Sequence, residues 1–301
     1  MNDLGLNEPP DSRTWYYSIE IAPGVFTSGL DHPNLAITRN LLRAIAFGGL
    51  DCLDVGTQEA VVPILLKKGG AKRVVAYDRN DHSACIADLR KLYGVDFDYA
   101  AGKQLTELPG LLDAGRGRFF DLVVFSGVLY HMINPLGMLA LVRGFCKVGG
   151  LFVFETAAFQ DSSCHLQFNA RGELGKASSY FVPTTTWMDY VLRMLGLRPI
   201  GVSYINGKSR EAPLRVAVLC RSEATPCPLD SGDDWVSARF HERAFGNESQ
   251  VDWVSLKKTS SAIDCRPDVP AMSGSIYDAV RMSSPYDFRV EELRLSFASS
   301  M

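Results

Sequence analysis

One stretch of the chain, residues 50–78, constrains its fold more than any other. It reads LDCLDVGTQEAVVPILLKKGGAKRVVAYD, and its apolar runs and turn residues predict a strand, a tight turn, a helix and a second strand. An acidic residue ends each predicted strand, Asp54 the first and Asp78 the second. Because parallel strands joined by a helix bring their carboxyl ends to one edge of a sheet, this pattern indicates a nucleoside-binding crevice.

The turn between strand and helix separates two kinds of nucleoside ligand. Of the G-x-G-x-x-G pattern it keeps only the first glycine, Gly56, whereas a pyrophosphate needs bare backbone at the later positions. A ligand without phosphates tolerates side chains there, which favours S-adenosylmethionine over NAD. Asp54 is then placed for the cationic amino acid moiety and Asp78, 22 residues after Gly56, for the two ribose hydroxyls.

Both carboxylates have a structural alternative. A strand-ending aspartate such as Asp54 can cap the helix that follows it, and Asp78 can serve the next helix in the same way. Asn80 and Asp81 are equally good caps for that helix. Asp54 and Asp78 together therefore indicate a ligand site more strongly than either residue alone.

The rest of the pattern predicts a doubly wound, Rossmann-like α/β fold with a seven-stranded, mostly parallel sheet and one antiparallel strand. We expect strands at about 51–55, 72–77, 96–100, 119–126, 151–155, 198–205 and 213–220. Helices are expected at about 33–47, 58–68, 81–93, 135–147 and 184–195. The domain boundaries expected from this pattern are an N-terminal arm and helix at 1–47, a core at 48–221 with an insertion at about 157–182, and a C-terminal extension at 222–301.

The C-terminal extension differs in composition from the core, since Ser, Asp and Pro dominate it without a clear period. Five aromatic residues indicate that part of it docks on the core: Trp235, Phe240, Trp253, Tyr277 and Tyr286. The extension is also a candidate contact for a homo-oligomer.

The composition limits the cellular compartment and the binding partners that we expect. A net charge of −3 and a pI near 6.0 give no global attraction to nucleic acid. The seven cysteines include no C-x-x-C pair, which predicts reduced thiols, and Cys164-His165 has no further ligands at metal-site spacing, so no metal is expected. No signal peptide and no membrane span are read, so we expect a cytoplasmic protein.

A second loop, residues 126–131, follows the predicted strand 119–126 and faces the same crevice. Its last two residues, Tyr130 and His131, are the candidate catalytic pair: His131 as the base that takes a proton from an acceptor, Tyr130 as the group that orients it. Alternatively, His131 caps the turn before Pro135 and Tyr130 packs beneath the N-terminal arm.

Six segments carry a family resemblance that spans about two thirds of the chain: WYYSIEIAPGVFTSG (15–29), CLDVGTQEA (52–60), VVAYD (74–78), FDLVVFSGVLYHMINPLGML (120–139), GGLFVFET (149–156) and SYFVPTTTWMDYVLRMLGL (179–197). They resemble the class I methyltransferases that use S-adenosylmethionine. Within that class they are most similar to the branch of the tRNA wobble-uridine (carboxymethoxyuridine) methyltransferases and its small-molecule relatives.

The resemblance implies a cofactor site in which the aromatic arm with Trp15 covers the ligand. Its other expected residues are Asp54, Gly56, Thr57, Gln58, Asp78, Arg79, Gly102, Ser126 and Gly127. Some members of the branch use a carboxylated form of the cofactor and need cationic groups for the extra carboxylate. The chain has no Lys or Arg between Trp15 and Asn34, so we expect plain S-adenosylmethionine, with S-adenosylhomocysteine as product.

These observations lead to a small-molecule O-, N- or C-methyltransferase, of the kind found in bacterial secondary metabolism, as the main hypothesis. Aromatic residues of the insertion and nearby segments would form the acceptor pocket: Phe159, His165, Phe168, Tyr180, Phe181 and Trp187. A tRNA acceptor is the first alternative, favoured by the resemblance and disfavoured by the acidic charge. A non-catalytic cofactor-binding scaffold, motivated by the altered turn, is the second, and an NAD-dependent oxidoreductase is the third.

Overall fold

The computed structural model describes residues 13–101, 104–113, 119–170, 172, 178–207, 212–227, 229, 263, 272 and 274–299. Its centre is a seven-stranded sheet with the order β10-β11-β7-β6-β3-β4-β5, in which only β11 runs against its neighbours. This arrangement confirms the predicted fold class. The strands are β3 (Asp51–Val55), β4 (Arg73–Asp78), β5 (Asp98–Ala101), β6 (Phe120–Ser126), β7 (Cys146–Ala158), β10 (Leu197–Ile205) and β11 (Leu214–Ser222).

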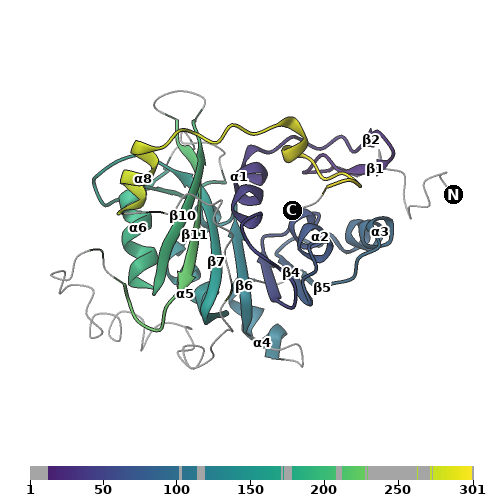
Figure 1. Ribbon diagram of the computed structural model, residues 1–301, viewed down its shortest axis with the longest axis horizontal. Coiled ribbons are helices and arrows are strands. Elements are labelled where there is room, and N and C mark those ends of the chain that lie inside the picture. The colour runs from purple at the N-terminus through teal and green to yellow at the C-terminus, as the bar shows by residue number, and fades with distance from the viewer. Residues whose placement is uncertain are drawn as a thin grey trace.

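Helices cover both faces of the sheet (Figure 1). Alternation along each strand explains the two layers: Leu53 and Val55 of β3 join the apolar cluster beneath one set of helices, whereas Cys52, just before Leu53, joins the other. The first set is α4 (Leu108–Asp113), α5 (Pro135–Arg143) and α6 (Thr185–Met194), and the second is α1 (Pro33–Leu42), α2 (Val61–Lys68) and α3 (Ser83–Tyr93).

Several predicted boundaries were wrong for local reasons. The first helix ends at Leu42 instead of 47, and the helix after Asn134 ends at Arg143 because β7 already begins at Cys146. The predicted strand 151–155 is the middle of this longer strand, which pairs with β11 along residues 151–158. Helix α3 has His82 at its N-cap position, while the Asp81 carboxylate accepts a hydrogen bond from the Ser83 amide at 2.9 Å.

The expected insertion contains a short antiparallel pair, β8 (Leu166–Phe168) with β9 (Phe181–Pro183). Thr184 caps α6, within the predicted helix at about 184–195, because its hydroxyl accepts a hydrogen bond from the Trp187 amide at 3.2 Å. Residues 171 and 173–177 lie outside the described residues, as do Gly102, Trp235, Phe240 and Trp253 from the sequence analysis.

The described end of the C-terminal extension packs on the core, as Tyr277 and Tyr286 led us to expect. Helix α8 (Ile276–Met282) lies against α6, where the Asp189 carboxylate accepts a hydrogen bond from the Ile276 amide at 3.0 Å. The chain then crosses α1, forms the single 3₁₀ turn η6 (Val290–Leu293), and reaches the hairpin of β1 (Glu20–Ala22) and β2 (Val25–Phe26). Figure 1 shows this path as the yellow segment along the top of the molecule.

Candidate functional site

A pocket lies at the carboxyl edge of the sheet, where β3, β4 and β6 end. Four chain segments line it: the N-terminal arm, α1, the end of β3 with its turn and helix, and the end of β6. The lining residues are Tyr17, Asn34, Leu35, Thr38, Asp54, Gly56, Thr57, Val62 and Ser126. Two segments that were predicted to form the site, the turn after β3 and the loop after β6, therefore meet here.

The turn after β3 is tight because Gly56 has a φ of +86° and its amide donates to the Tyr77 carbonyl at 2.8 Å. A Cβ at this position would lie 2.2 Å from a methyl carbon of Val128. Two residues of the turn other than glycine also adopt left-handed backbone, with φ of 49° at Gln58 and 60° at Ala60. Helix α2 consequently starts at Val61 instead of 58, and the turn forms without the later glycines.

Asp78 is buried at the end of β4, and its carboxylate organises the neighbouring backbone. One oxygen accepts a hydrogen bond from the Gln58 amide at 2.9 Å and the other accepts one from the Asn80 amide, also at 2.9 Å. A carboxylate offers about four acceptor positions, so lone pairs remain for the two ribose hydroxyls. Asp78 thus ties the turn to β4 and keeps the capacity expected of a ribose ligand.

Asp54 is fully buried in the pocket wall. Burial raises the pKa of this carboxyl to about 7, a hydrogen bond with Thr57 opposes the shift, and the charge of Asp78 adds to it. Among the described residues no Lys, Arg or His forms an ion pair with Asp54. A buried carboxyl in this situation is suited to a cationic ligand group, which supplies the missing partner.

A buried polar network runs beside the pocket from α1 to β11. The Arg215 guanidinium donates two hydrogen bonds of 2.7 Å to the fully buried carboxylate of Glu155. Ser126 donates to Glu155 at 3.1 Å and, since its proton is used there, accepts from Thr38 at 3.0 Å. Burial alone would lower the pKa of Arg215, but the Glu155 carboxylate raises it above the ordinary value.

Tyr130 belongs to this network. Its ring is buried, and the Arg215 guanidinium lies 4.9 Å from the ring centroid. A Cβ on Gly127 would lie 3.6 Å from the Tyr130 hydroxyl and 3.9 Å from a Glu155 carboxylate oxygen, and the actual Gly127 has a φ of +74°. The candidate residues Ser126, Gly127 and Tyr130 are therefore brought together around one ion pair.

The N-terminal arm closes the pocket with Tyr17, whereas Trp15 is buried in the apolar core next to Arg13 and does not line the pocket. The Tyr16 amide donates to the Glu59 carboxylate at 2.6 Å, which joins the arm to the turn after β3. Burial raises the pKa of Tyr16 to about 12, and Tyr130, Arg215 and Glu155 all influence it, so the phenol lies toward the network.

His131 ends the 3₁₀ turn η3 (Leu129–His131) and lies against the Tyr130 ring, with 4.3 Å between ring centroids. Its Nδ1 lies 2.8 Å from the Ser178 carbonyl oxygen. A carbonyl only accepts, so Nδ1 carries the proton and the neutral ring has its acceptor lone pair on Nε2. The ring is thus held in the tautomer that a base requires.

Arg79, the remaining described candidate, is exposed and is not among the residues that line the pocket. Five polar residues of the pocket and its network were missed by the sequence analysis: Tyr17, Asn34, Thr38, Glu155 and Arg215. The apolar lining residues Leu35 and Val62 were missed as well. Glu155 carried a usable signal, because a charged residue at the end of the apolar run LFVFE must have a buried partner. Nothing local marks Arg215 as that partner.

Replacing Gly56 by Ala should break the turn, because the added Cβ collides with Val128 and φ of +86° is unfavourable for alanine. We expect a loss of about 1–3 kcal/mol in the free energy of unfolding, measured by urea denaturation, and no calorimetric binding of S-adenosylhomocysteine. Gly94 has a comparable φ of +62° but open space around a Cβ, so Gly94→Ala should lower stability alone. Wild-type affinity in Gly56→Ala would show that the turn does not shape the site.

We expect the ammonium group of S-adenosylhomocysteine to pair with the ionised form of Asp54, so its binding should tighten as pH rises. With a pKa of about 7 in the free protein, the carboxyl is mostly protonated at pH 6 and must lose its proton on binding. The dissociation constant should therefore fall about tenfold between about pH 6 and pH 8. Calorimetry at each pH measures it, and Asp54→Asn should remove the dependence. The same slope in that variant would assign it to another group.

The chain is similar in sequence to known proteins. The methyltransferase domain family matches residues 31–194, more than half of the chain. A tRNA U34 carboxymethyltransferase of Desulforapulum autotrophicum is 31% identical over 105 residues, which cover 34% of this chain and 32% of that protein. One of Pseudoalteromonas translucida is 22% identical and covers 73% and 58%. The chain thus spans about one third to three fifths of the length of these relatives.

Solved structures support the fold alone. The N-terminal domain of EvdMO1, solved in the presence of S-adenosylhomocysteine and D-fucose, is 16% identical, with a TM-score of 0.50 over 71% of this chain and 93% of that one. Within the described residues Asp54 has no ion-pair partner and Asp78 keeps acceptor positions, which suits the ammonium group and the ribose of S-adenosylmethionine. The sequence-based assignment to the methyltransferases is confirmed: the chain belongs to the methyltransferase domain family.

Proposed function

We propose that the chain methylates a small apolar or aromatic acceptor. The observation that carries the proposal is the group of exposed hydrophobic side chains beside the Tyr130–His131 loop. Ile133, Phe168 and Tyr180 are 75%, 59% and 40% exposed, although side chains of this kind are usually covered. These side chains would form the surface on which an apolar acceptor docks.

This apolar surface is attached directly to the candidate catalytic loop. The Tyr180 amide donates to the Tyr130 carbonyl at 2.6 Å, and the Ser178 carbonyl accepts from His131. Phe168 and Phe181 lie 5.2 Å apart between ring centroids in the pair β8–β9. Because hydrogen bonds join residues 178–180 to the Tyr130–His131 loop, an acceptor on this aromatic surface would lie next to His131. His165 is also exposed here, whereas Trp187 packs against the core.

S-Adenosylmethionine supplies a methyl group that is already activated on a sulfonium, so the chain's own task is alignment, proton removal and exclusion of water. Asp54 pairs with the ammonium group and Asp78 with the ribose hydroxyls. The Tyr17 side chain covers the pocket. His131 takes the acceptor's proton at Nε2. Tyr130, whose ring packs against Arg215, orients the acceptor. Thr57, Gln58, Ser126 and Gly127 contribute the surrounding walls.

Plain methyl transfer is favoured over carboxymethyl transfer by the state of Arg215. This guanidinium lies 4.9 Å from the centroid of the Tyr130 ring, and Glu155 already occupies it with two hydrogen bonds. A compensated cation attracts an additional carboxylate weakly, since the net charge of the pair is zero. Calorimetry with the carboxylated cofactor as a competitor checks this point.

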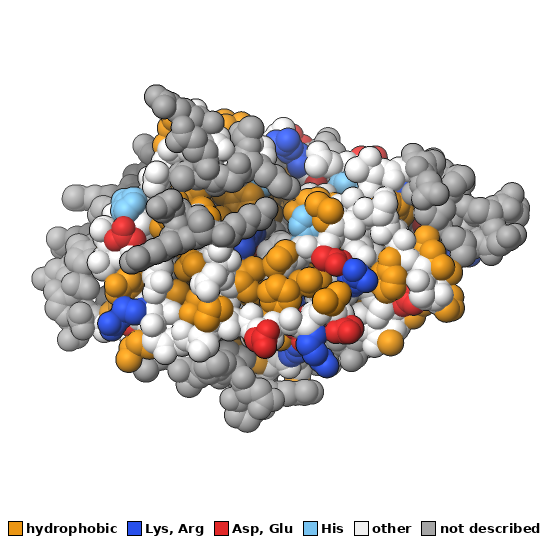
Figure 2. All heavy atoms as spheres, turned by 90° about the horizontal axis from the view of Figure 1, so that it is seen from above, with side chains coloured by type: hydrophobic (Ala, Val, Ile, Leu, Met, Phe, Trp, Pro, Cys, Tyr) orange, Lys and Arg blue, Asp and Glu red, His pale blue; other side chains and the backbone are white. Residues whose placement is uncertain are grey.

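A tRNA acceptor is the second candidate, because the names of two relatives above include tRNA. The basic residues Lys67, Lys68 and Arg73 do not support it. Lys67, Lys68 and Arg73 lie at the amino ends of the strands, opposite the pocket, and Lys67 and Lys68 donate to backbone carbonyls of residues 71, 72 and 297. On the face shown in Figure 2, Lys and Arg side chains lie singly among acidic and hydrophobic ones.

A reducing, cytoplasmic location fits the proposed function, since all six described cysteines are free thiols. None of the helices in the described part of the chain has the length and apolar character needed to cross a bilayer, and no cluster of metal-binding side chains occurs among the described residues. Self-association through the C-terminal extension, and the division into arm, core and extension, remain proposals.

The proposal is tested with S-adenosylmethionine labelled in its methyl group. Purified protein is incubated with bulk unmodified tRNA or with a panel of phenols, catechols and aromatic amines, and label is followed into each fraction. Labelled small aromatics with unlabelled tRNA support the proposal. Labelled tRNA, together with tRNA binding that weakens steeply with salt, would transfer the assignment to the second candidate.

Replacing His131 by Ala should lower the turnover of an accepted substrate about 10²–10⁴-fold while leaving the dissociation constant of S-adenosylhomocysteine unchanged, because His131 is not among the residues that line the cofactor pocket. His131→Gln separates two roles, since its amide can still donate to the Ser178 carbonyl but cannot take a proton. Equal losses in both variants identify a base. Recovery of turnover in His131→Gln would identify a positioning residue instead.

A further inference from the structure

The last described residues, 284–299, form a segment that we name the C-terminal strap. It leaves α8, crosses α1 and ends beside β1 (Figure 1). The family match ends at residue 194, so the strap lies outside the matched domain. Its contacts nevertheless fall on the two segments that form one side of the cofactor pocket, α1 and the N-terminal arm.

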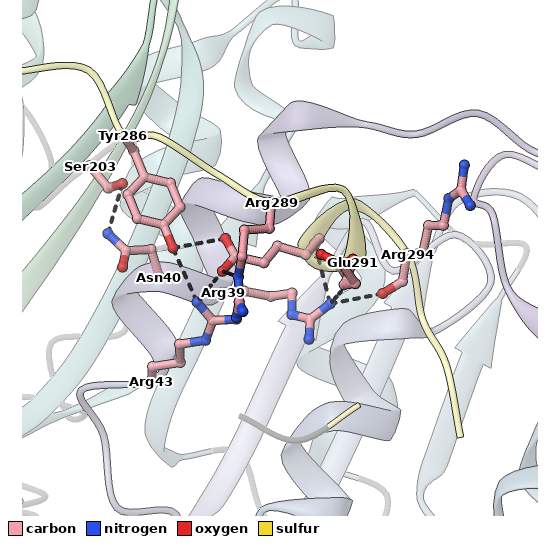
Figure 3. Close-up of polar contacts among 9 residues, drawn as sticks. Arg39, Asn40, Arg43, Ser203, Tyr286, Arg289, Glu291 and Arg294 are labelled. Atoms are coloured by element: carbon pink, nitrogen blue, oxygen red, sulfur yellow. Dashed lines mark hydrogen bonds and ion pairs between the residues drawn. The ribbon is translucent and has the colours of Figure 1, made fainter. Parts of the chain in front are cut away.

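Arg39 of α1 makes the central contact. Its side chain is buried, and one terminal nitrogen donates to the carbonyls of Arg294 at 2.8 Å, Glu292 at 3.2 Å and Glu291 at 3.4 Å. These carbonyls belong to η6 and its C-terminal end, where carbonyl groups lack partners within the helix. Figure 3 shows the Arg39 side chain extending from α1 to this turn.

Two further contacts hold the strap on either side of Arg39. Arg43 donates to the Glu292 carboxylate at 2.8 Å and to the Tyr286 hydroxyl at 3.1 Å, and that hydroxyl donates to Glu292 at 2.8 Å (Figure 3). Arg294 donates twice to Asp31, at 2.8 Å each, just before α1 begins. The strap therefore fixes α1 at its start, at its middle and at its end.

The strap also pairs with the N-terminal arm. The Glu20 amide donates to the Leu295 carbonyl at 2.8 Å, and the Leu295 amide donates to the Ser18 carbonyl at 3.1 Å. The Phe297 amide donates to the Glu20 carboxylate at 2.8 Å. These bonds begin one residue after Tyr17, which lines the pocket. The arm is consequently held like an edge strand by residues near the other end of the chain.

The pocket side of α1 adjoins its strap side. Asn34 and Thr38, one turn apart, line the pocket, and Thr38 donates to Ser126 in the network of Glu155. Leu35, Arg39 and Arg43 follow each other at intervals of four along the neighbouring stripe of the same helix. A shift of α1 caused by loss of the strap would displace Asn34, Leu35 and Thr38 together.

We propose that the C-terminal strap sets the affinity for the cofactor, with Arg39 as the positioning residue that links it to the pocket. Among the described residues, no hydrogen bond or ion pair joins a strap residue to a side chain that lines the pocket, so the strap acts by holding α1 and the arm against the turn after β3. This inference rests on the proposed function only through the cofactor, and it does not depend on the acceptor.

The test compares Arg39→Lys with Arg281→Lys in the full chain. Lysine keeps the charge of Arg39, but its ammonium nitrogen lies about one bond closer to the backbone than the terminal guanidinium nitrogen that serves the three carbonyls. Arg281, half-exposed on α8 outside the strap, is the matched control. We expect calorimetry with S-adenosylhomocysteine to show binding about tenfold weaker in Arg39→Lys and unchanged in Arg281→Lys. Hydrogen exchange should be faster at residues 16–20 and 34–42 in Arg39→Lys.

A purely structural role predicts a different result, namely a lower melting temperature with an unchanged dissociation constant at a temperature well below melting. That outcome would overturn the proposal. Asp31→Asn provides a second variant at a more exposed contact of the strap, in case Arg39→Lys does not fold, and it should weaken binding about threefold. Because no acceptor is present, a failed search for acceptors leaves this result intact, and unchanged affinity in both variants rejects the strap even if methyl transfer is found.

Discussion

The ion pair between Glu155 and Arg215 is the interaction on which the arrangement of the site depends. Glu155 is fully buried at the carboxyl end of β7, where an uncompensated charge would be very costly. The partner comes from β11, the one antiparallel strand, so the pair holds the register between β7 and β11 at the edge where the pocket lies. Hydrogen bonds from Ser126 to Glu155 and from Thr38 to Ser126 connect the pair to β6 and α1. The charged pair therefore stabilises four separate segments in the positions that shape one pocket.

The turn after β3 illustrates a second constraint. Left-handed backbone at Gln58 and Ala60 costs roughly 1 kcal/mol or more each, and it persists because surrounding contacts hold it. Asp78 binds the Gln58 amide, Glu59 binds the Tyr16 amide, and the Thr57 carbonyl accepts from Ala60. The absence of the later glycines had motivated the scaffold hypothesis. The formed turn, with a pocket beside it, removes that motivation.

Much of the fold and part of the site could be predicted from the sequence, and the division has a physical reason. The alternation in β3 and β6, the acidic ends of β3 and β4, and Thr184 as a cap are local patterns, and local patterns are legible in a single sequence. Arg215 and Thr38 are ordinary residues until the fold brings them to Glu155 and Ser126. Tyr17 replaced Trp15 at the pocket because the neighbouring residues of an irregular arm differ in direction in a way that no period encodes. The end of α1 at Leu42 was missed for a related reason, since apolar residues 44–47 continue the helical pattern but pack as a loop.

The pairing of the strap with the arm also bears on the order of events during synthesis. The Phe297 amide meets the Glu20 carboxylate across 277 positions of chain, and contacts of such separation form late because closing a long loop is entropically slow. In a nascent chain the N-terminal arm is synthesised well before residues 295–297 and cannot be secured until they are available. The parallel core can assemble earlier from neighbouring strands and helices. A nascent chain would then carry a formed sheet and an unfinished pocket, so competence to bind the cofactor would report that the strap has left the ribosome.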